Sequence, residues 1–236
     1  MDPKRGVGQK GTQTFSLSKA ASKAVVSRQY NGIHVGYYIR ILSPSENVPS
    51  VVTIRTALTK EGLAGTLTVE SGTDEDWTQV TLAHKDGLEI ADIERNGAPS
   101  NDLVSEEIEE FLKEIADCKP ASAAAWLGEY LLSVRTIYAF QLLRGTDEKG
   151  GWDILGKVKA SIFTQVGGIL QADGEGFSEE EGYHILWQFS NSVKGPWLMG
   201  VLKDGQWVHF QMDLGNKKHR AAFLRGEIPE GVKTRE

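Results

Sequence analysis

Alternating apolar and polar positions predict two β-hairpins, each built around an Asp-Gly pair. The first hairpin spans Val80 to Ile93 and turns at Asp86-Gly87, and the second spans Trp197 to Met212 and turns at Asp204-Gly205. Asp-Gly pairs favour tight two-residue turns because both positions tolerate positive φ angles. In the first hairpin such a turn pairs Val80 with Ile93, Ala83 with Ile90 and His84 with Glu89.

The second hairpin has apolar residues on both of its faces. One face carries Trp197, Met199, Val201, Val208, Phe210 and Met212, and the other carries Leu198, Leu202, Trp207, His209 and Gln211. An antiparallel sheet usually leaves one face to water. We therefore expect the second face to be covered, either by a long helix or by another subunit that contacts Leu198, Leu202 and Trp207.

Other runs rich in Val, Ile, Thr and Tyr predict further strands. Three of them precede the first hairpin, at Gly32 to Leu42, Ser50 to Leu58 and Gly65 to Glu70. Two more precede the second hairpin, at Val158 to Leu170 and Tyr183 to Ser190.

Apolar residues at helical spacing predict two consecutive helices between the hairpins. The first begins at Ser105, whose hydroxyl can cap a free amide, and stops at Pro120. The second runs from Ala121 to about Leu143 and has the widest apolar stripe of the chain. We expect this second helix to be the central packing element.

Strands in runs, followed by helices and then by more strands, indicate an α+β fold. We expect a mainly antiparallel sheet with two Asp-Gly hairpins, packed on two central helices. The tripeptide Lys-Asp-Gly occurs in both hairpins. It is compatible with a duplication into two β-then-α halves, residues 29–146 and 147–226, within one domain of residues 29–226 that is followed by a C-terminal tail, residues 227–236.

The composition is that of a soluble globular protein: 236 residues, of which 40% are hydrophobic and 25% charged. No uncharged apolar run reaches the length of a membrane span. The single cysteine, Cys118, cannot form an intrachain disulfide, which favours a cytoplasmic or otherwise intracellular protein. The first residues lack the apolar segment of a secretory signal, but they are Ser-rich and poor in acids, so import into an organelle stays an alternative.

Charge is distributed unevenly along the chain, whose net charge is −6. Residues 1–28 have a net charge of +5, residues 217–236 of +3, and the residues between them of −14. We expect residues 1–28 to form a flexible basic arm that binds nucleic acid or another polyanion. The six cations of this arm are Lys4, Arg5, Lys10, Lys19, Lys23 and Arg28. In the alternative, they fold back over the acidic body.

A second basic cluster follows Asn216, which can cap a short helix that ends by Gly226. The cations of this helix are Lys217, Lys218, Arg220 and Arg225. Cations near the positive end of a helix dipole are unfavourable, so local stability does not explain the cluster. A phosphate bound by the cations and by the free amides would explain it. Neutralisation by acids of the body is the alternative.

An acidic loop between residues 173 and 184 is a candidate metal site. Its potential ligands are Asp173, Glu175, Glu179, Glu181 and His184. Oxygen-rich loops that contain glycines can wrap Ca²⁺ or Mg²⁺, and a histidine can join a transition-metal site. The spacing does not match an EF-hand, and a solvated turn between strands is the alternative.

No motif fixes a reaction, because the chain lacks the phosphate-loop, GxSxG, HExxH and paired CxxC patterns. We therefore predict no catalytic residue and no cofactor. The first hypothesis is a non-catalytic binding or assembly protein that forms homo-oligomers and binds a polyanion through its basic ends. The alternatives are a metal-dependent or ligand-binding enzyme at residues 173–184, and a scaffold component without a nucleic-acid role.

Overall fold

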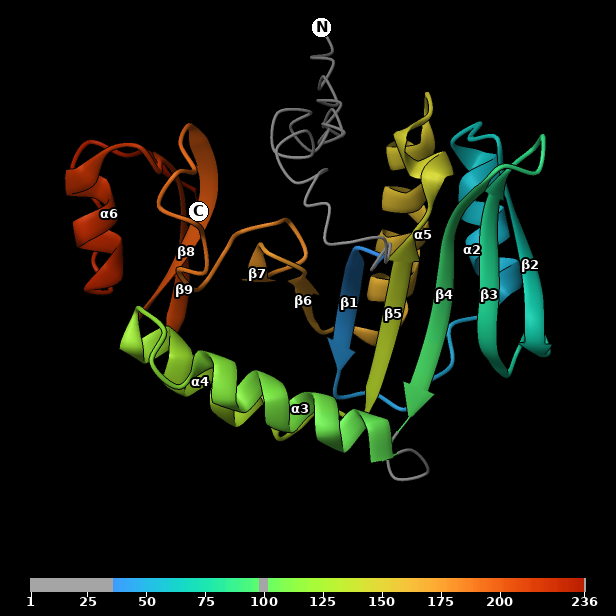
Figure 1. Ribbon diagram of the computed structural model, residues 1–236, viewed down its shortest axis with the longest axis horizontal. Helices are drawn as coiled ribbons and strands as arrows, with labels where there is room; N and C mark the ends of the chain where they lie inside the picture. The colour runs from blue at the N-terminus through green and yellow to red at the C-terminus, as the bar shows by residue number, and fades with distance from the viewer. Residues whose placement is uncertain (1–35, 98–101, 236) are drawn as a thin grey trace, which may run out of the picture. The chain divides into compact units, whose positions relative to one another are not determined.

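The computed structural model describes residues 36–97 and 102–235 (Figure 1). The chain divides into two units, Met1–Val35 and Gly36–Glu236. The predicted basic arm, residues 1–28, lies outside the described residues, and its role stays a prediction. Across the described ranges, no helix combines the length and the apolar character that a bilayer crossing requires.

Antiparallel sheets dominate the fold. The main sheet has the strand order β2-β3-β4-β5-β1-β6-β7, and a second sheet has the order β10-β9-β8. The strands of the main sheet are β1 (Tyr38–Ser43), β2 (Gly65–Gly72), β3 (Trp77–His84), β4 (Glu89–Gly97), β5 (Thr136–Leu142), β6 (Ile169–Ala172) and β7 (Gly176–Ser178). Those of the second sheet are β8 (Pro196–Lys203), β9 (Gln206–Asp213) and β10 (Thr234–Arg235). With the helices packed on them, these sheets confirm the α+β fold.

Helices cover both faces of the main sheet (Figure 1). Helices α2 (Val51–Lys60) and α5 (Gly151–Val166) pack on the face that carries Ile41 and Phe140. Helices α3 (Asp102–Ile115) and α4 (Ala121–Leu131) pack on the opposite face, against Leu42, Ile137 and Ile169. Adjacent residues of a strand point to opposite faces, so β1 and β5 are buried on both sides. A short 3-10 helix, η1 (Arg144–Asp147), and helix α6 (Lys217–Leu224) complete the elements.

Both predicted hairpins are present. In the second, Lys203 pairs with Gln206, and both turn residues, Asp204 and Gly205, have positive φ angles, as a two-residue turn requires. In the first, the predicted pairing of Val80 with Ile93 is confirmed.

The pairings predicted near the tip of the first hairpin are wrong. A bulge after Leu82 places Ala83 opposite Glu89, so that neither Ala83–Ile90 nor His84–Glu89 is a pair. The His84 ring instead bonds the carbonyl oxygen of Gly145, at 2.8 Å.

The segment from Ser50 to Leu58, predicted as a strand, forms helix α2 instead. Its β-branched residues favour strands, but Val51, Ile54 and Leu58 recur at helical spacing and are buried against the sheet. Tertiary packing therefore overrides local propensity in this segment. Of the predicted strand from Gly32 to Leu42, the described part contributes β1, which begins at Tyr38.

The predicted long helix from Ala121 to Leu143 is two elements, α4 and β5. A strand that is buried on both faces has a continuous apolar run without alternation, so periodicity does not separate it from a buried helix. The predicted strand from Val158 to Leu170 is mostly the end of α5, followed by the start of β6. The predicted strand from Tyr183 to Ser190 is reduced to a single bridge residue, His184. Helix α3 begins at Asp102, so Ser105 is inside it and does not cap it.

The two predicted halves contribute to the same sheet. Strands β6 and β7, from the second half, extend the sheet beyond β1, from the first half. The boundary between residues 146 and 147 therefore falls within one packed structure. A duplication stays a prediction.

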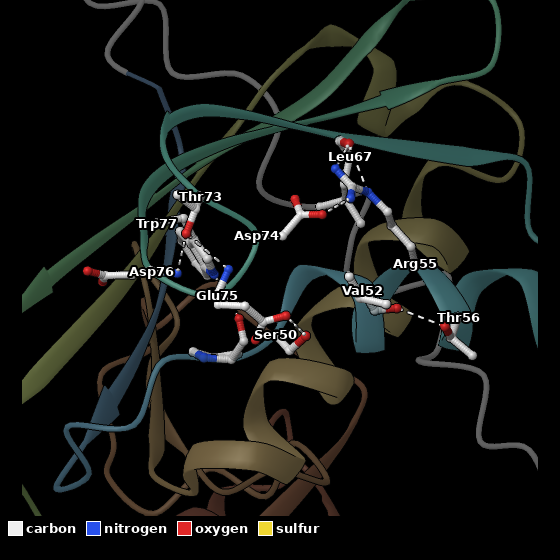
Figure 2. Close-up of polar contacts among 11 residues, drawn as sticks. Ser50, Val52, Arg55, Thr56, Leu67, Thr73, Asp74, Glu75, Asp76 and Trp77 are labelled. Atoms are coloured by element: carbon white, nitrogen blue, oxygen red, sulfur yellow. Dashed lines mark hydrogen bonds and ion pairs between the residues drawn. The ribbon is translucent and has the colours of Figure 1, made fainter.

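Polar contacts join the start of α2 to the turn between β2 and β3 (Figure 2). The amide of Val51 donates to the carbonyl oxygen of Asp74, at 3.0 Å, and the hydroxyl of Ser50 donates to Glu75, at 3.3 Å. The indole N–H of the fully buried Trp77 donates to the carbonyl oxygen of Pro49, at 2.8 Å. These bonds fix the loop before α2 to the sheet.

We expect Trp77→Phe to lower the free energy of unfolding by about 1–3 kcal/mol, because the Pro49 carbonyl would lose its buried donor. Trp152→Phe, at a half-buried tryptophan of α5, is the matched control and should cost less. Urea unfolding of the three proteins measures the difference. Equal losses for the two variants would show that the indole bond contributes nothing specific.

Candidate functional site

Residues 186–235 form a packed structure that we call the C-terminal unit. It contains β8, β9, α6 and β10, and its core consists of Phe189, Met199, Val201, Phe210, Met212, Leu214 and Phe223. Residues after α6, predicted as a tail, pack back on this unit: Ile228 and Val232 contact its core, and β10 pairs with β9.

The main chain of His184 connects the C-terminal unit to the main sheet. Its amide donates to the carbonyl oxygen of Leu198 and its carbonyl accepts from Gly200, both at 2.9 Å. On its other side His184 forms a bridge with Ser178 of β7. The two sheets are therefore linked by backbone hydrogen bonds.

The two linked parts carry opposite charge. Residues 36–185 contain 12 Lys and Arg against 26 Asp and Glu, a net charge of −14. The C-terminal unit contains 8 Lys and Arg against 4 Asp and Glu, a net charge of +4. The described charge is thus divided between two parts of the fold, the acidic main-sheet body of residues 36–185 and the basic C-terminal unit, whereas the division predicted from the sequence lay at residue 216.

The first turn of α6 is fixed by two short polar side chains. As predicted, Asn216 caps the helix, because its side-chain oxygen accepts from the amides of Lys218, at 3.0 Å, and His219, at 3.4 Å. Asp213 accepts from the amides of Gly195, at 2.9 Å, and Gly215, at 2.7 Å, and these bonds lower its pKa. Asp213 thereby holds the loop before β8 beside the loop before α6.

This arrangement places a third lysine near the two predicted ones. Lys194 lies against Gly215, directly before the helix cap. Lys194, Lys217 and Lys218 are all exposed, and no carboxylate within the described ranges forms an ion pair with them. The three ammonium groups are therefore available to a ligand in solvent.

Arg220, in contrast, is held by its own molecule. Its guanidinium donates to Asn191 and to the carbonyl oxygen of Leu214, each at 3.0 Å, and lies over the ring of Trp187, 4.6 Å from its centre. Its Nε is buried and has no acceptor among the described residues. Nδ1 of His219 is also buried and has no hydrogen-bond partner among them. Arg225 forms an ion pair with Glu227, at 2.6 Å.

The acidic residues of the loop 173–184 have separate partners. Asp173 forms an ion pair with Arg40, at 2.7 Å, and Arg40 also binds Glu107 of α3, at 2.5 Å. Glu179 binds the ring of His209, which stacks on Tyr183. Within the described part of the chain, no three His, Cys, Asp or Glu side chains are grouped to hold a metal ion.

The remaining potential ligands of this loop also interact with other groups. Glu175 hydrogen-bonds Tyr37, and burial raises the pKa of both groups. Burial also lowers the pKa of Lys159, whose charge interacts with that of Glu175. Glu181 adds to the rise in the pKa of Glu179, which comes mainly from burial. The geometry therefore gives the predicted metal site no support.

His184 is buried between two aromatic rings. Its ring contacts Phe189 and Trp197, with ring centres 4.9 and 5.2 Å away, and burial lowers its pKa to about 4. Nδ1 of His184 has no hydrogen-bond partner among the described residues. The ring is therefore neutral near pH 7, and we assign it to the junction between the sheets.

The predicted interface residues lie on the covered face of the second hairpin. Trp207 packs edge-on against Trp126 of α4, with ring centres 5.1 Å apart. The start of the predicted long helix thus covers part of this face, one of the two coverings expected from the sequence. Leu198 and Leu202 are half-buried. Their contact with another subunit stays a prediction.

Two open grooves lie on the surface of the described part of the chain. One, of about 300 Å³, lies between α3 and α4 and includes Cys118. The other, of about 340 Å³, lies between α2 and α5 and includes Val52. Neither is the enclosed, polar-anchored cavity that small-molecule enzymes use.

Sequence reasoning missed three residues that lie around α6 in the C-terminal unit: Lys194, Asp213 and Trp187. The Asp-x-Gly-Asn sequence before α6 signals a polar turn that could have drawn attention to Asp213. The register of the second hairpin, which pairs Pro196 with Asp213, could have placed Lys194 near the start of α6. Nothing local connects Trp187 with α6, because they meet only in the folded unit.

No known protein family matches the chain, and searches of curated proteins and of solved structures find no match. The function is therefore inferred from the geometry of the site.

The pKa of His184 predicts acid sensitivity at the junction. Because the folded pKa is about 4 and the ordinary value 6.5, the unfolded chain takes up this proton first as pH falls. The contribution of the neutral His184 ring to the free energy of unfolding is fully present above about pH 6.5. It is lost as the pH falls towards 4, and the loss is at most about 3 kcal/mol. His184→Gln should flatten the dependence of unfolding free energy on pH in this window. Equal slopes for the two proteins would contradict the assignment.

The contacts of Arg220 predict a structural role that the neighbouring lysines lack. Arg220→Gln should lower the free energy of unfolding by about 1–3 kcal/mol, since it removes a charged donor from two acceptors. Lys217→Gln should change it by less than about 0.5 kcal/mol. Thermal or urea unfolding compares the two. A similar small effect for both variants would place Arg220 among the free cations.

Proposed function

We propose that the protein is a non-catalytic binding and assembly protein whose basic C-terminal unit binds nucleic acid or a chemically similar polyanion. The observation that carries this proposal is the group of three exposed lysines, Lys194, Lys217 and Lys218, which form no ion pair within the described ranges and lie on the described part of the fold that has net positive charge. The Nε–H of Arg220, in the same helix as two of them, is buried without an acceptor among the described residues. A buried charged donor without an acceptor is rare and calls for a water molecule or an anion.

The geometry favours binding of a polyanion by the lysine side chains over binding by the free amides at the start of α6. Asn216 already occupies the amides of Lys218 and His219, so these two amides do not face a ligand. Three lysines, one in the loop before β8 and two in the first turn of α6, instead present exposed charges, which suit the repeated phosphates of a nucleic-acid backbone. Lysine side chains that neutralise phosphates release condensed counterions, and this release drives association.

The acidic main-sheet body supports the same proposal by restricting where a polyanion can bind. A net charge of −14 on residues 36–185 repels phosphates, whereas the C-terminal unit attracts them. The arm of residues 1–28 would add a second basic contact. Self-association through Leu198 and Leu202 belongs to the same proposal, because both side chains remain partly accessible on β8.

The test is the salt dependence of binding to a fluorescent oligonucleotide, measured with the full-length chain. Lys217→Gln/Lys218→Gln should weaken binding and reduce the slope of log affinity against log salt by about 1.4 for a single strand or about 1.8 for a duplex. Lys60→Gln/Lys149→Gln removes the same charge from exposed sites on the main-sheet body. This control should keep the wild-type slope.

A variant with Gln at all six cations of the arm separates the contribution of the arm from that of α6. Under the proposal, binding by this variant is weaker but still sensitive to Lys217 and Lys218. If adding Lys217→Gln/Lys218→Gln to the arm variant leaves binding unchanged, the C-terminal unit is not a polyanion site.

A further inference from the structure

Strand β2 is an edge of the main sheet, and its outward main-chain groups can be assigned from the register. The amide of Lys85 donates to the carbonyl oxygen of Ala64, which makes this pair a hydrogen-bonded one. Hydrogen-bonded and non-hydrogen-bonded pairs alternate along an antiparallel ladder. Leu67, opposite Leu82, is therefore in a non-hydrogen-bonded pair. Its N–H and C=O point away from β3, as do those of Gly65 and Val69.

This edge lacks the usual protection against another strand. Residues 62–69 contain no charged residue and no proline, although natural edges usually carry Lys or Pro. The side chains of Thr66 and Thr68 are exposed, and Leu67 is buried. The register irregularities of β2 begin only after Val69. Five consecutive residues, 65–69, thus form a regular, uncharged edge that no other strand of the described residues pairs.

One contact blocks the middle of the edge. Arg55 of α2 donates from Nε and Nη2 to the carbonyl oxygen of Leu67, at 3.3 and 3.0 Å (Figure 2). Its Nη1 forms an ion pair with Asp74, at 2.6 Å, which orients the guanidinium. The outward carbonyl of Leu67 is therefore satisfied within the molecule. Another strand can use it only if Arg55 releases it.

We propose that the β2 edge is a self-pairing surface for a second copy of this chain, and that Arg55 is the latch that holds it closed. Antiparallel pairing about a two-fold axis at Leu67 would place Thr66 opposite Thr68 of the second copy and Gly65 opposite Val69 of the second copy. The outward groups of Gly65, Leu67 and Val69 then form hydrogen-bonded pairs along the whole edge.

The sequence of the edge favours a second copy over an unrelated strand. Thr66 and Thr68 flank Leu67 symmetrically, and threonine pairs across strands are favourable. In this register Glu70 faces Ala64 of the second copy, so that the carboxylates do not oppose each other. A two-fold interface needs this kind of self-complementary patch. The surface is separate from α6, so the inference goes beyond polyanion binding and does not depend on it.

The first experiment opens the latch in the full-length chain. Arg55→Met keeps the stem of the side chain and removes the donors to Leu67. Sedimentation equilibrium should show a dimer dissociation constant at least roughly tenfold lower than that of the wild type. Asp74→Asn, which leaves Arg55 in place without its ion-pair partner, should shift the equilibrium in the same direction. If both variants have the wild-type mass distribution, the latch does not exist.

The second experiment tests the register with matched charges in the Arg55→Met background. Thr66→Lys/Thr68→Lys places lysines opposite lysines and should abolish the added dimer. Thr66→Glu/Thr68→Lys places each Glu opposite a Lys of the second copy and should retain it. The amides of Leu67 and Val69 should exchange more slowly with deuterium as the protein concentration rises. Equal dimerisation by the two charge variants, or unchanged exchange at these amides, would overturn the proposal.

Discussion

The backbone junction at His184 is the constraint on which the arrangement of charge depends. His184 bonds β8 on one side and bridges to β7 on the other, and together with the packing of Trp207 on Trp126 it joins a body of charge −14 to a unit of charge +4. Its ring is buried among aromatic side chains and is neutral. The ion pair of Glu179 with His209 crosses the same joint, and burial raises the pKa of Glu179. The junction fixes the basic unit to the acidic body through main-chain bonds, which leaves the exposed lysines outside the joint.

Within the basic unit, arginine and lysine have different roles. Arg220 binds two acceptors and stacks on Trp187, and Arg225 is paired with Glu227, so these two of the three arginines have partners within the folded protein. A planar guanidinium suits such fixed contacts, whereas an ammonium on a flexible stem suits a polymer of repeated phosphates. Arg55, beside the edge strand β2 of the main sheet, also makes fixed contacts within the molecule. It satisfies a main-chain carbonyl that would otherwise be open to another strand.

Local chemistry explains what could be predicted from the sequence. The Asp204-Gly205 hairpin and the Asn216 cap depend on residues that are adjacent in the chain, and both are present as predicted. Helix α2 and strand β5 were assigned wrongly because burial on the sheet decides their conformation. Lys194 lies beside the start of α6 because the second hairpin pairs Pro196 with Asp213 and Asp213 bonds both neighbouring loops, and the second of these causes has no counterpart in the local sequence around Lys194.

Under the proposed function, a polyanion binds the C-terminal unit and does not bind the main-sheet body. Backbone amide chemical shifts, followed by NMR while a short oligothymidylate is added, test it most directly. We expect shifts concentrated at Lys194, Lys217, Lys218 and His219, together with the side-chain Nε signal of Arg220, and few shifts on β2 to β5. Shifts spread over the main-sheet body, or none in the C-terminal unit, would contradict it.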